Sequence, residues 1–403
     1  MADSGAVMLD DAWRRYCAAV EESRSLLLSS DRCRDIDAHI RATYDIAMIQ
    51  AVGFNFYVAP RRTHPNFYIH QVFSPFEVGW GQPCPDFLYR WAFVDGRGTY
   101  RVAGKRGTTP WAEIQVLNGF WGDEKLIHVT NVDLDRHTKP DGTFEIAFAA
   151  DARAGVDWVA IPREARNVVL QSREAWCDWQ HETGLQMEIE PIEPFLDEPW
   201  AFSAEELARR LDEAARWAHR NAKFNVDQMQ RIVSGAGGTN RFLTESEGKT
   251  RGGLIGAIKS RMGYEVARDE ALIIELNVPK CRYWSVSLAD MWYQVTDYVF
   301  HQSSLNGCQA VLDADGRFRA VLAHEDPGVA NWLDLVGCAL GLLNTRILYP
   351  EEGFKADFQA TKVKASEVRE RLSNAKTVTP DARKGILARR AHAALARYGY
   401  RLR

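Results

Sequence analysis

The feature that most constrains this chain is a series of strand-like runs, rich in aromatic and β-branched residues, separated by Asp-Gly turns. Positions 95–96 separate FLYRWAFV from TYRVAG, and positions 141–142 separate IHVTNVDL from TFEIAFAA. Positions 315–316 separate CQAVLD from RFRAVLAH in the same way. Because Asp-Gly turns join neighbouring antiparallel strands, the pattern predicts hairpins and not βαβ units.

Helical periodicity frames this β centre. The first sixty residues repeat apolar side chains at helical spacing, and Asp31 or Asp35 could cap the second helix. Ser203 and Glu206 form a predicted capping box for an internal helix. Thr-Pro at 379–380 predicts the start of a basic C-terminal helix, whose cations we expect to face solvent.

The predicted fold class is α+β, with two antiparallel β blocks of sandwich or jelly-roll type. In chain order we expect an N-terminal helical segment 1–62, a first antiparallel β block 63–195, a helix with a Gly-rich loop 196–268, a jelly-roll-like β block 269–350 and a C-terminal helical segment 351–403. The eight Gly of residues 235–263 predict no regular element, and this stretch could be a lid or a flexible connector.

Composition restricts the class of protein. Of 403 residues, 46% are hydrophobic and 26% charged, which is typical of a globular protein. The formal net charge of −4 gives no field that would attract nucleic acid or acidic lipid. The N-terminus does not resemble a signal peptide, no run is apolar enough for a membrane span, and the seven Cys are scattered. We therefore expect a cytoplasmic protein with reduced thiols and no nucleic-acid or membrane partner.

Several runs of the chain carry a family resemblance. They are LNVPKCRYWSVSLADMW, HQSSLNGCQAVLDADGRFRAVLAHEDPGVANWLDLVG, GLLNTRILYP and the earlier PDFLYRWAFVDGRGTYRVAGK. These runs resemble the bacterial family known as domain of unknown function twelve-fourteen. The resemblance implies a jelly-roll-like sheet near the C-terminus and little about chemistry, so function must be argued from individual residues.

Five residues are candidates for catalysis. Tyr283 could donate a proton or bind an oxyanion if its strand face lines a pocket, and the alternative is an exposed face. His301 and His324 could each act as a general base or serve as a hydrogen-bonded structural group. Arg101 could hold an oxyanion, or it could form a salt bridge with an acid such as Asp86.

Aromatic side chains are the candidate walls of a binding site. Thirteen Trp, thirteen Tyr and eighteen Phe are more than packing requires. The candidate substrate-binding residues are Tyr89, Trp91, Trp284, Trp292, Asn331 and Trp332. The aromatic ones could equally belong to the core, and Asn331 could satisfy the amides of a turn.

These residues lead to a functional expectation. We expect a cofactor-independent lyase or isomerase that transfers protons on a small aromatic molecule, such as a lignin-derived or polycyclic compound. No cofactor is expected, because GxGxxG after a strand, GxxxxGK[ST], HExxH and GxSxG are all absent, and the lack of a His-x-His pair argues against a metal. A non-catalytic protein that binds carbohydrate or another ligand is the alternative, and an assembly role is a third. We also expect a homodimer.

Overall fold

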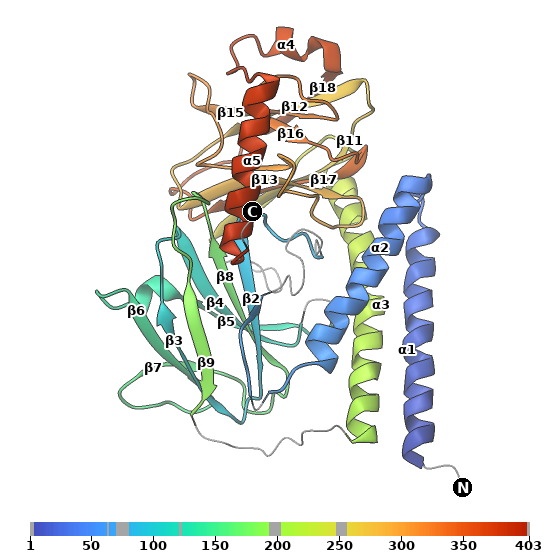
Figure 1. The fold of residues 1–403 in the computed structure, drawn as a ribbon, viewed down its shortest axis with the longest axis vertical. Coiled ribbons are helices and arrows are strands. Elements are labelled where there is room, and N and C mark those ends of the chain that lie inside the picture. Colours follow the sequence, from blue (N-terminus) through green and yellow to red (C-terminus); the bar gives the residue numbers. More distant parts are fainter. Residues whose placement is uncertain are drawn as a thin grey trace.

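A computed structural model describes residues 4–62, 64–69, 80–120, 123–192, 203–246 and 256–400. Two β blocks stack along the long axis of the molecule, and the N-terminal helices stand along one flank (Figure 1). Each block contains two sheets. The predicted α+β class with two sandwich-like β blocks is confirmed.

The first block is a sandwich whose sheets have the orders β1-β2-β8-β4-β5 and β7-β6-β3-β9. Its strands are β1 (Tyr68–Ile69), β2 (Phe87–Val94), β3 (Thr99–Lys105), β4 (Trp111–Asn118), β5 (Ile127–Asp133), β6 (Thr143–Ala149), β7 (Asp157–Ala160), β8 (Val168–Ala175) and β9 (Gln186–Pro191). An apolar core lies between the sheets, where Tyr100, Ile114 and Phe148 are fully buried. Side chains that alternate along each strand supply this core from both sheets.

The second block repeats this plan with sheets of order β10-β11-β17-β13-β14 and β16-β15-β12-β18. Its strands are β10 (Leu243–Ser246), β11 (Ala257–Glu265), β12 (Glu270–Asn277), β13 (Tyr283–Asp290), β14 (Ser304–Asn306), β15 (Arg317–Ala323), β16 (Trp332–Asp334), β17 (Leu340–Leu348) and β18 (Phe358–Lys364). Tyr264, Ile274 and Phe318 are fully buried in its core.

The Asp-Gly turns connect different sheets and do not form the predicted hairpins. β2 pairs with β1 and β8, whereas β3, which follows the turn at 95–96, pairs with β6 and β9. The turn at 141–142 likewise leads from β5 in one sheet to β6 in the other. Residues 308–313 form no strand at all. The hairpin prediction was wrong because a turn motif specifies a chain reversal, while the apolar faces decide which strands pair.

The Gly-rich stretch 235–263 is more regular than predicted. It contains the end of α3, the strand β10 and most of β11. Gly237 and Gly238 have φ angles of +74° and +132°, which allow the chain to turn sharply after the helix. The part on which the lid hypothesis depended, residues 247–255, lies outside the described residues.

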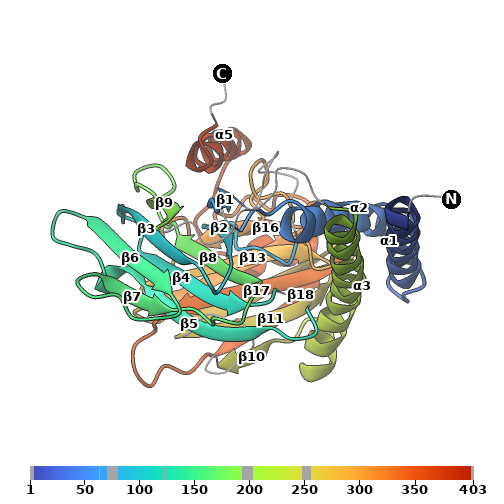
Figure 2. The same ribbon diagram turned by 90° about the horizontal axis from the view of Figure 1, so that it is seen from below.

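Three helices cover the flank of the β blocks. They are α1 (Ser4–Leu28), α2 (Ile36–Gly53), which continues into a π-helical turn at Phe54–Val58, and α3 (Ala204–Gly235). Figures 1 and 2 show them side by side. The predicted caps at Asp35 and Ser203 are confirmed. The Asp35 side chain accepts from the backbone N–H of Ala38 at 2.8 Å, and the Ser203 hydroxyl accepts from the backbone N–H of Glu206 at 3.2 Å. Among the described residues, no helix has the length and apolar character needed to cross a bilayer.

The C-terminal region adds α4 (Val368–Arg371) and α5 (Pro380–Arg397), and buried arginines dock α5 on both blocks. Arg383 pairs with Asp326 at 2.9 Å, and Arg390 donates to a backbone carbonyl after β13 at 2.5 Å. Arg397 donates to a carbonyl just before β2 at 2.9 Å. The expectation that the cations of this helix face solvent was wrong for these three, because their guanidinium groups bond acceptors in other segments.

A disulfide links the two β blocks. Cys177 follows β8 and Cys308 follows β14, and their Cα atoms are 5.5 Å apart across a sequence separation of 131 residues. The other five Cys are free thiols. The prediction that all seven are reduced was therefore wrong for this pair, because sequence spacing cannot indicate which distant cysteines become neighbours.

Candidate functional site

A cavity of about 140 Å³ lies where the two β blocks and α3 meet. β2 and β8 of the first block contribute residues to its wall, as do β11 and β17 of the second. The segment at 80–83 and the segment just after β13 complete the lining. Both blocks therefore build this one site, which is the kind of concave junction where ligands commonly bind.

Aromatic side chains form much of the cavity wall. Tyr89 and Trp91 lie two residues apart on β2, so they share one face of the strand. Trp80 precedes β2, Phe224 comes from α3, and Tyr293 follows β13. The structure thus brings the sequence candidates Tyr89 and Trp91 into a common site, and their role in substrate binding stays a prediction.

Four cationic residues line the same cavity: Arg173, Lys259, Arg261 and Arg346. Arg173 forms an ion pair with Glu113 on the adjacent strand β4. Arg261 pairs with a glutamate of β10, so both of these guanidinium groups have a carboxylate partner. The described lining residues include no Asp or Glu, so the cavity is positively charged at its surface.

Arg346 has no carboxylate partner within the described chain, although it is only 7% exposed. Its Nη2 donates to the backbone carbonyl of Gln82 at 3.0 Å. With the amide of Asn344 oriented so that its oxygen faces Arg346, that oxygen accepts from Nη1 and Nη2 at 3.0 Å each. The guanidinium also lies 6.0 Å from the ring centre of Phe87. All of these contacts are with neutral groups.

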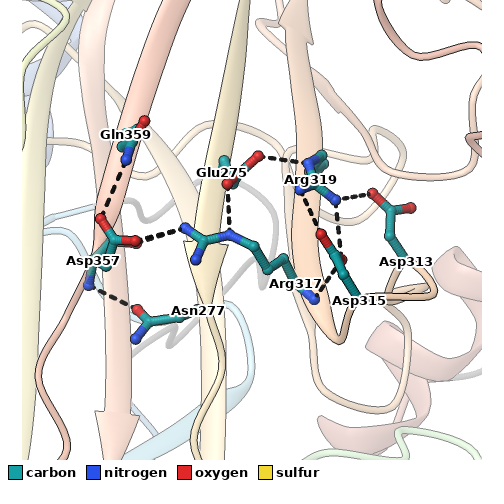
Figure 3. A network of polar contacts seen from close by, with 8 residues as sticks. All are labelled: Glu275, Asn277, Asp313, Asp315, Arg317, Arg319, Asp357 and Gln359. Carbon is teal, nitrogen blue, oxygen red and sulfur yellow. Dashed lines mark hydrogen bonds and ion pairs between the residues drawn. The ribbon is translucent and has the colours of Figure 1, made fainter.

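Unlike Arg346, two arginines on strand β15 of the second block are paired with carboxylates (Figure 3). Arg319 binds Glu275 at 2.5 Å and Asp315 at 2.7 Å, and Arg317 binds Glu275 at 2.5 Å and Asp357 at 3.0 Å. This network is partly exposed, and carboxylates already match its cations. It therefore has a structural role of modest energy, and it leaves no charge for a ligand to match.

Several residues of the cavity wall also carry a polar atom that is buried in the protein interior. Five lining residues have a buried nitrogen or oxygen with no hydrogen-bond partner in the described part of the chain. These atoms are Gln82 Nε2, Gln171 Oε1, Arg173 Nε, Asn225 Oδ1 and Arg261 Nε. Such an atom typically costs about 1–3 kcal/mol when it is left unpaired in the interior.

Backbone strain also occurs at the cavity. Five non-glycine residues of the described chain have positive φ, namely Gln82, Asn240, Tyr293, Val336 and Tyr349. Two of these five, Gln82 at +52° and Tyr293 at +69°, line the cavity. Strained conformations of this kind cost on the order of 1–3 kcal/mol and gather at functional sites.

Asp86 and Tyr283, two of the candidate catalytic residues, meet in a buried cluster next to the cavity. The Tyr283 hydroxyl donates to Asp86 Oδ2 at 2.5 Å. Burial raises the pKa of Asp86 and raises the pKa of Tyr283 well above its ordinary value. Neither residue lines the cavity, but the backbone N–H of Cys84 in the same cluster donates to the hydroxyl of Tyr89, which does.

The other three candidate catalytic residues lie outside the cavity. Arg101 pairs with Glu145 at 3.1 Å and with a glutamate of β9 at 2.9 Å, so its partner is not Asp86. His301 bonds the carboxylate at the end of β16 at 2.7 Å, and this bond raises the pKa of the histidine. His324 bonds a backbone carbonyl at 3.0 Å. These contacts agree with the structural alternative for all three residues, and their catalytic role stays a prediction.

The remaining candidate binding residues also pack within the protein. Trp332 and Trp292 each donate their indole N–H to a backbone carbonyl, at 3.0 and 3.1 Å. Asn331 bonds backbone groups of two neighbouring segments, as the turn interpretation allowed. Trp284 packs edge-on against Phe318, with ring centres 5.1 Å apart. The structure places none of the four in the cavity.

Known proteins resemble both the second block and the whole fold. Residues 263–352 match the family model described as "Protein of unknown function (DUF1214)". The resemblance to this family is confirmed. The DUF1214 segment contains β12 to β17 and contributes Tyr293, Asn344 and Arg346 to the cavity. The other lining residues come from the rest of the chain, so the site is larger than the DUF1214 segment.

Solved structures extend the comparison beyond this segment. An uncharacterised protein from Burkholderia cenocepacia is 25% identical, and the match covers 90% of this chain and 99% of that one with a TM-score of 0.81. A protein from Vibrio parahaemolyticus is 11% identical over 89% of this chain and 100% of its own, with a TM-score of 0.41. No curated protein matches the chain. The first structure therefore has a similar fold over most of this chain.

Sequence reasoning missed the polar half of the cavity. Asn344 and Arg346 lie two residues apart in the otherwise apolar strand LGLLNTRIL. Asn221 and Asn225 lie one turn apart on the buried face of α3. Polar side chains at inward-facing positions of buried elements are the signal that could have revealed them, because such groups require partners.

Two buried carboxyl groups beside the cavity lead to a prediction about pH. Asp45 on α2 accepts from the side chain of Asn225 at 3.3 Å, and Asp290 ends β13. Burial raises the pKa of Asp290 to about 6, and burial and then the charge of Asp290 raise that of Asp45. Arg41 is 4.0 Å from Asp290, too distant to offset its burial. The carboxyl group of Asp290 therefore binds its proton more tightly in the folded chain than in the unfolded chain. As a result, the free energy of unfolding falls as pH rises from about 4 to about 6.

We expect Asp290→Asn to reduce this fall by roughly 3 kcal/mol, since two pKa units correspond to about that energy. Urea unfolding of both proteins at intervals from pH 4 to 7 measures the difference. Asp315→Asn is the control, because Arg319 lowers the pKa of Asp315 to about 2 and its effect lies below pH 4. Equal slopes for wild type and Asp290→Asn would contradict the prediction.

Proposed function

We propose that this protein binds a small molecule with a single aromatic ring in the cavity between its β blocks. The observation that carries the proposal is the cavity at the junction of the β blocks, whose wall combines the aromatic side chains of Tyr89 and Trp91 with the cationic side chain of Arg346. The volume of about 140 Å³ supports a ligand of this size, since an apolar cavity of about 150 Å³ admits benzene. A polycyclic ligand has less support for the same reason.

Proton transfer on the bound ligand is a second candidate function. Arg261 Nη1 lies 3.4 Å from the hydroxyl oxygen of Tyr293, and both residues line the cavity. Arg261 donates a hydrogen bond to this hydroxyl, and a hydroxyl group at the cavity wall can exchange a proton with a bound ligand. The cofactor-independent lyase or isomerase stays a proposal on this basis, with Tyr293 as its proton-transfer group.

The carbohydrate-binding alternative has less support. It required Trp284, Trp292 or Trp332 as exposed platforms, and these side chains pack against other parts of the protein. A cytoplasmic location also stays a proposal, and the Cys177–Cys308 disulfide is an observation against a strongly reducing compartment. The homodimer stays a prediction that light scattering on the purified protein would test.

A ligand screen with matched tryptophan variants tests the proposal. We expect single-ring aromatic compounds to raise the melting temperature of the wild-type protein, with affinity about tenfold lower in Trp91→Leu, because a ring contact is lost. Trp284→Leu is the control, since it removes a tryptophan outside the cavity. Each protein is compared with its own ligand-free melting temperature, which removes differences in intrinsic stability.

Mass spectrometry on every sample separates the two candidate functions. A ligand that stabilises the protein and changes mass supports an enzyme, whereas an unchanged ligand supports a binding protein. If no aromatic compound stabilises the wild type, or if Trp284→Leu weakens binding as much as Trp91→Leu, the cavity is not the site.

A further inference from the structure

We infer that the ligand of the cavity carries a carboxylate and that Arg346 binds it. This inference rests on the proposed function and specifies the chemical class of the ligand. The observation behind it concerns the side chain of Arg346, which lines the cavity although the residue is only 7% exposed. Its guanidinium group has only neutral hydrogen-bond partners in the described chain. A buried charge without a counter-ion is strongly unfavourable, so an anionic ligand would supply what the site lacks.

Arg346 differs in this respect from other buried arginines. Within the cavity, Arg173 and Arg261 each pair with a glutamate. On α5, one buried arginine pairs with Asp326, and the other two lie near the buried carboxyl group of Asp86. The protein therefore compensates these charges itself, and it leaves the charge of Arg346 to be matched at the cavity surface.

The surroundings of Arg346 indicate what kind of anion fits. Tyr89 and Trp91 place aromatic rings in the same cavity, so a bare inorganic ion would leave the apolar walls without contact. Lys259 on β11 contributes a second cationic side chain to the same lining. A guanidinium can donate two parallel hydrogen bonds to a carboxylate, which an amide or an alcohol cannot accept in the same way. An aromatic carboxylate meets both requirements, because its ring contacts the aromatic wall and its carboxylate binds the guanidinium.

Ligand pairs measured on the wild-type protein test the inference directly. Isothermal calorimetry with benzoate, benzamide and acetate compares a charged ring, a neutral ring of similar shape and a charge without a ring. We expect benzoate to bind at least about thirtyfold more tightly than benzamide, which is the low end for losing one partner of a buried charge pair. We also expect acetate to bind more weakly than benzoate, because it makes no contact with the aromatic wall.

The outcomes separate this inference from the proposed function. If benzamide binds as tightly as benzoate, the aromatic site stands and the inference about charge is overturned. If acetate binds as tightly as benzoate, the ring contributes nothing and the proposed aromatic ligand is overturned. If neither ring compound binds, the proposed function fails, and the inference fails with it.

Variants of Arg346 assign the charge to one residue. In Arg346→Met we expect the affinities for benzoate and benzamide to converge, and in Arg346→Lys we expect part of the preference to remain. Arg101→Met is the matched control, because this arginine lies outside the cavity in an exposed ion-pair cluster, and it should keep the full preference. A preference that survives in Arg346→Met would assign the anion to another cation and overturn the inference.

Discussion

Replacing Asp86 with Ala should lower the free energy of unfolding by about 3 to 5 kcal/mol, because three buried donors lose their acceptor. The Asp86 carboxyl group accepts from Tyr283 at 2.5 Å, from Asn306 at 2.6 Å and from Trp179 at 2.8 Å. Asp86 itself is fully buried. Trp179 belongs to the first β block, whereas Tyr283 and Asn306 belong to the second. The substitution therefore weakens the junction between the blocks.

Two further variants give this prediction internal controls. Asp86→Asn keeps one acceptor oxygen at the same position, so we expect roughly half of the loss. Tyr283→Phe removes one donor and leaves the carboxyl group in place, so we expect about 1–2 kcal/mol. Urea unfolding followed by circular dichroism measures all three. A loss below about 1 kcal/mol for Asp86→Ala would contradict the role of this residue at the junction.

Replacing Glu113 with Gln should lower the free energy of unfolding by about 3 to 5 kcal/mol, because it leaves the guanidinium of Arg173 buried and uncompensated. The two side chains form an ion pair across β4 and β8, with exposed fractions of 2% for Glu113 and 6% for Arg173. Asn131 also donates to Glu113 at 2.8 Å. Desolvation makes the loss of one partner severe, even though the intact pair contributes little net stability.

Glu145→Gln is the matched control for this second prediction. Glu145 also pairs with an arginine on a neighbouring strand, but its side chain is 37% exposed. Water solvates the arginine that remains, so we expect a loss below about 1 kcal/mol. Equal losses in the two variants would show that burial does not decide the strength of these pairs.

The same substitution should also affect ligand binding. Because Arg173 lines the cavity and loses its carboxylate partner, Glu113→Gln should bind benzoate more tightly than the wild type does.

The sequence by itself determined the fold class and the position of several helices and strands. The run FLYRWAFV is β2, residue for residue, and the caps at Asp35, Ser203 and Thr379 begin helices where they were predicted. These features depend on neighbours within a few positions along the chain, through side-chain alternation and hydrogen bonds to the next turn. The candidate wall residues Tyr89 and Trp91 were accessible to the same reasoning, because they share one strand face.

Only the tertiary structure decided which strands pair, which cysteines join and which arginine is left without a carboxylate. The turn at 95–96 leads into another sheet, and Cys177 meets Cys308 across 131 residues. Arg101, Arg173 and Arg346 all occupy strands, yet the first is partly exposed, the second is paired in the interior and the third is buried among neutral groups. Burial and pairing depend on residues that are distant in the sequence and are brought together only when the apolar faces of the sheets and helices pack.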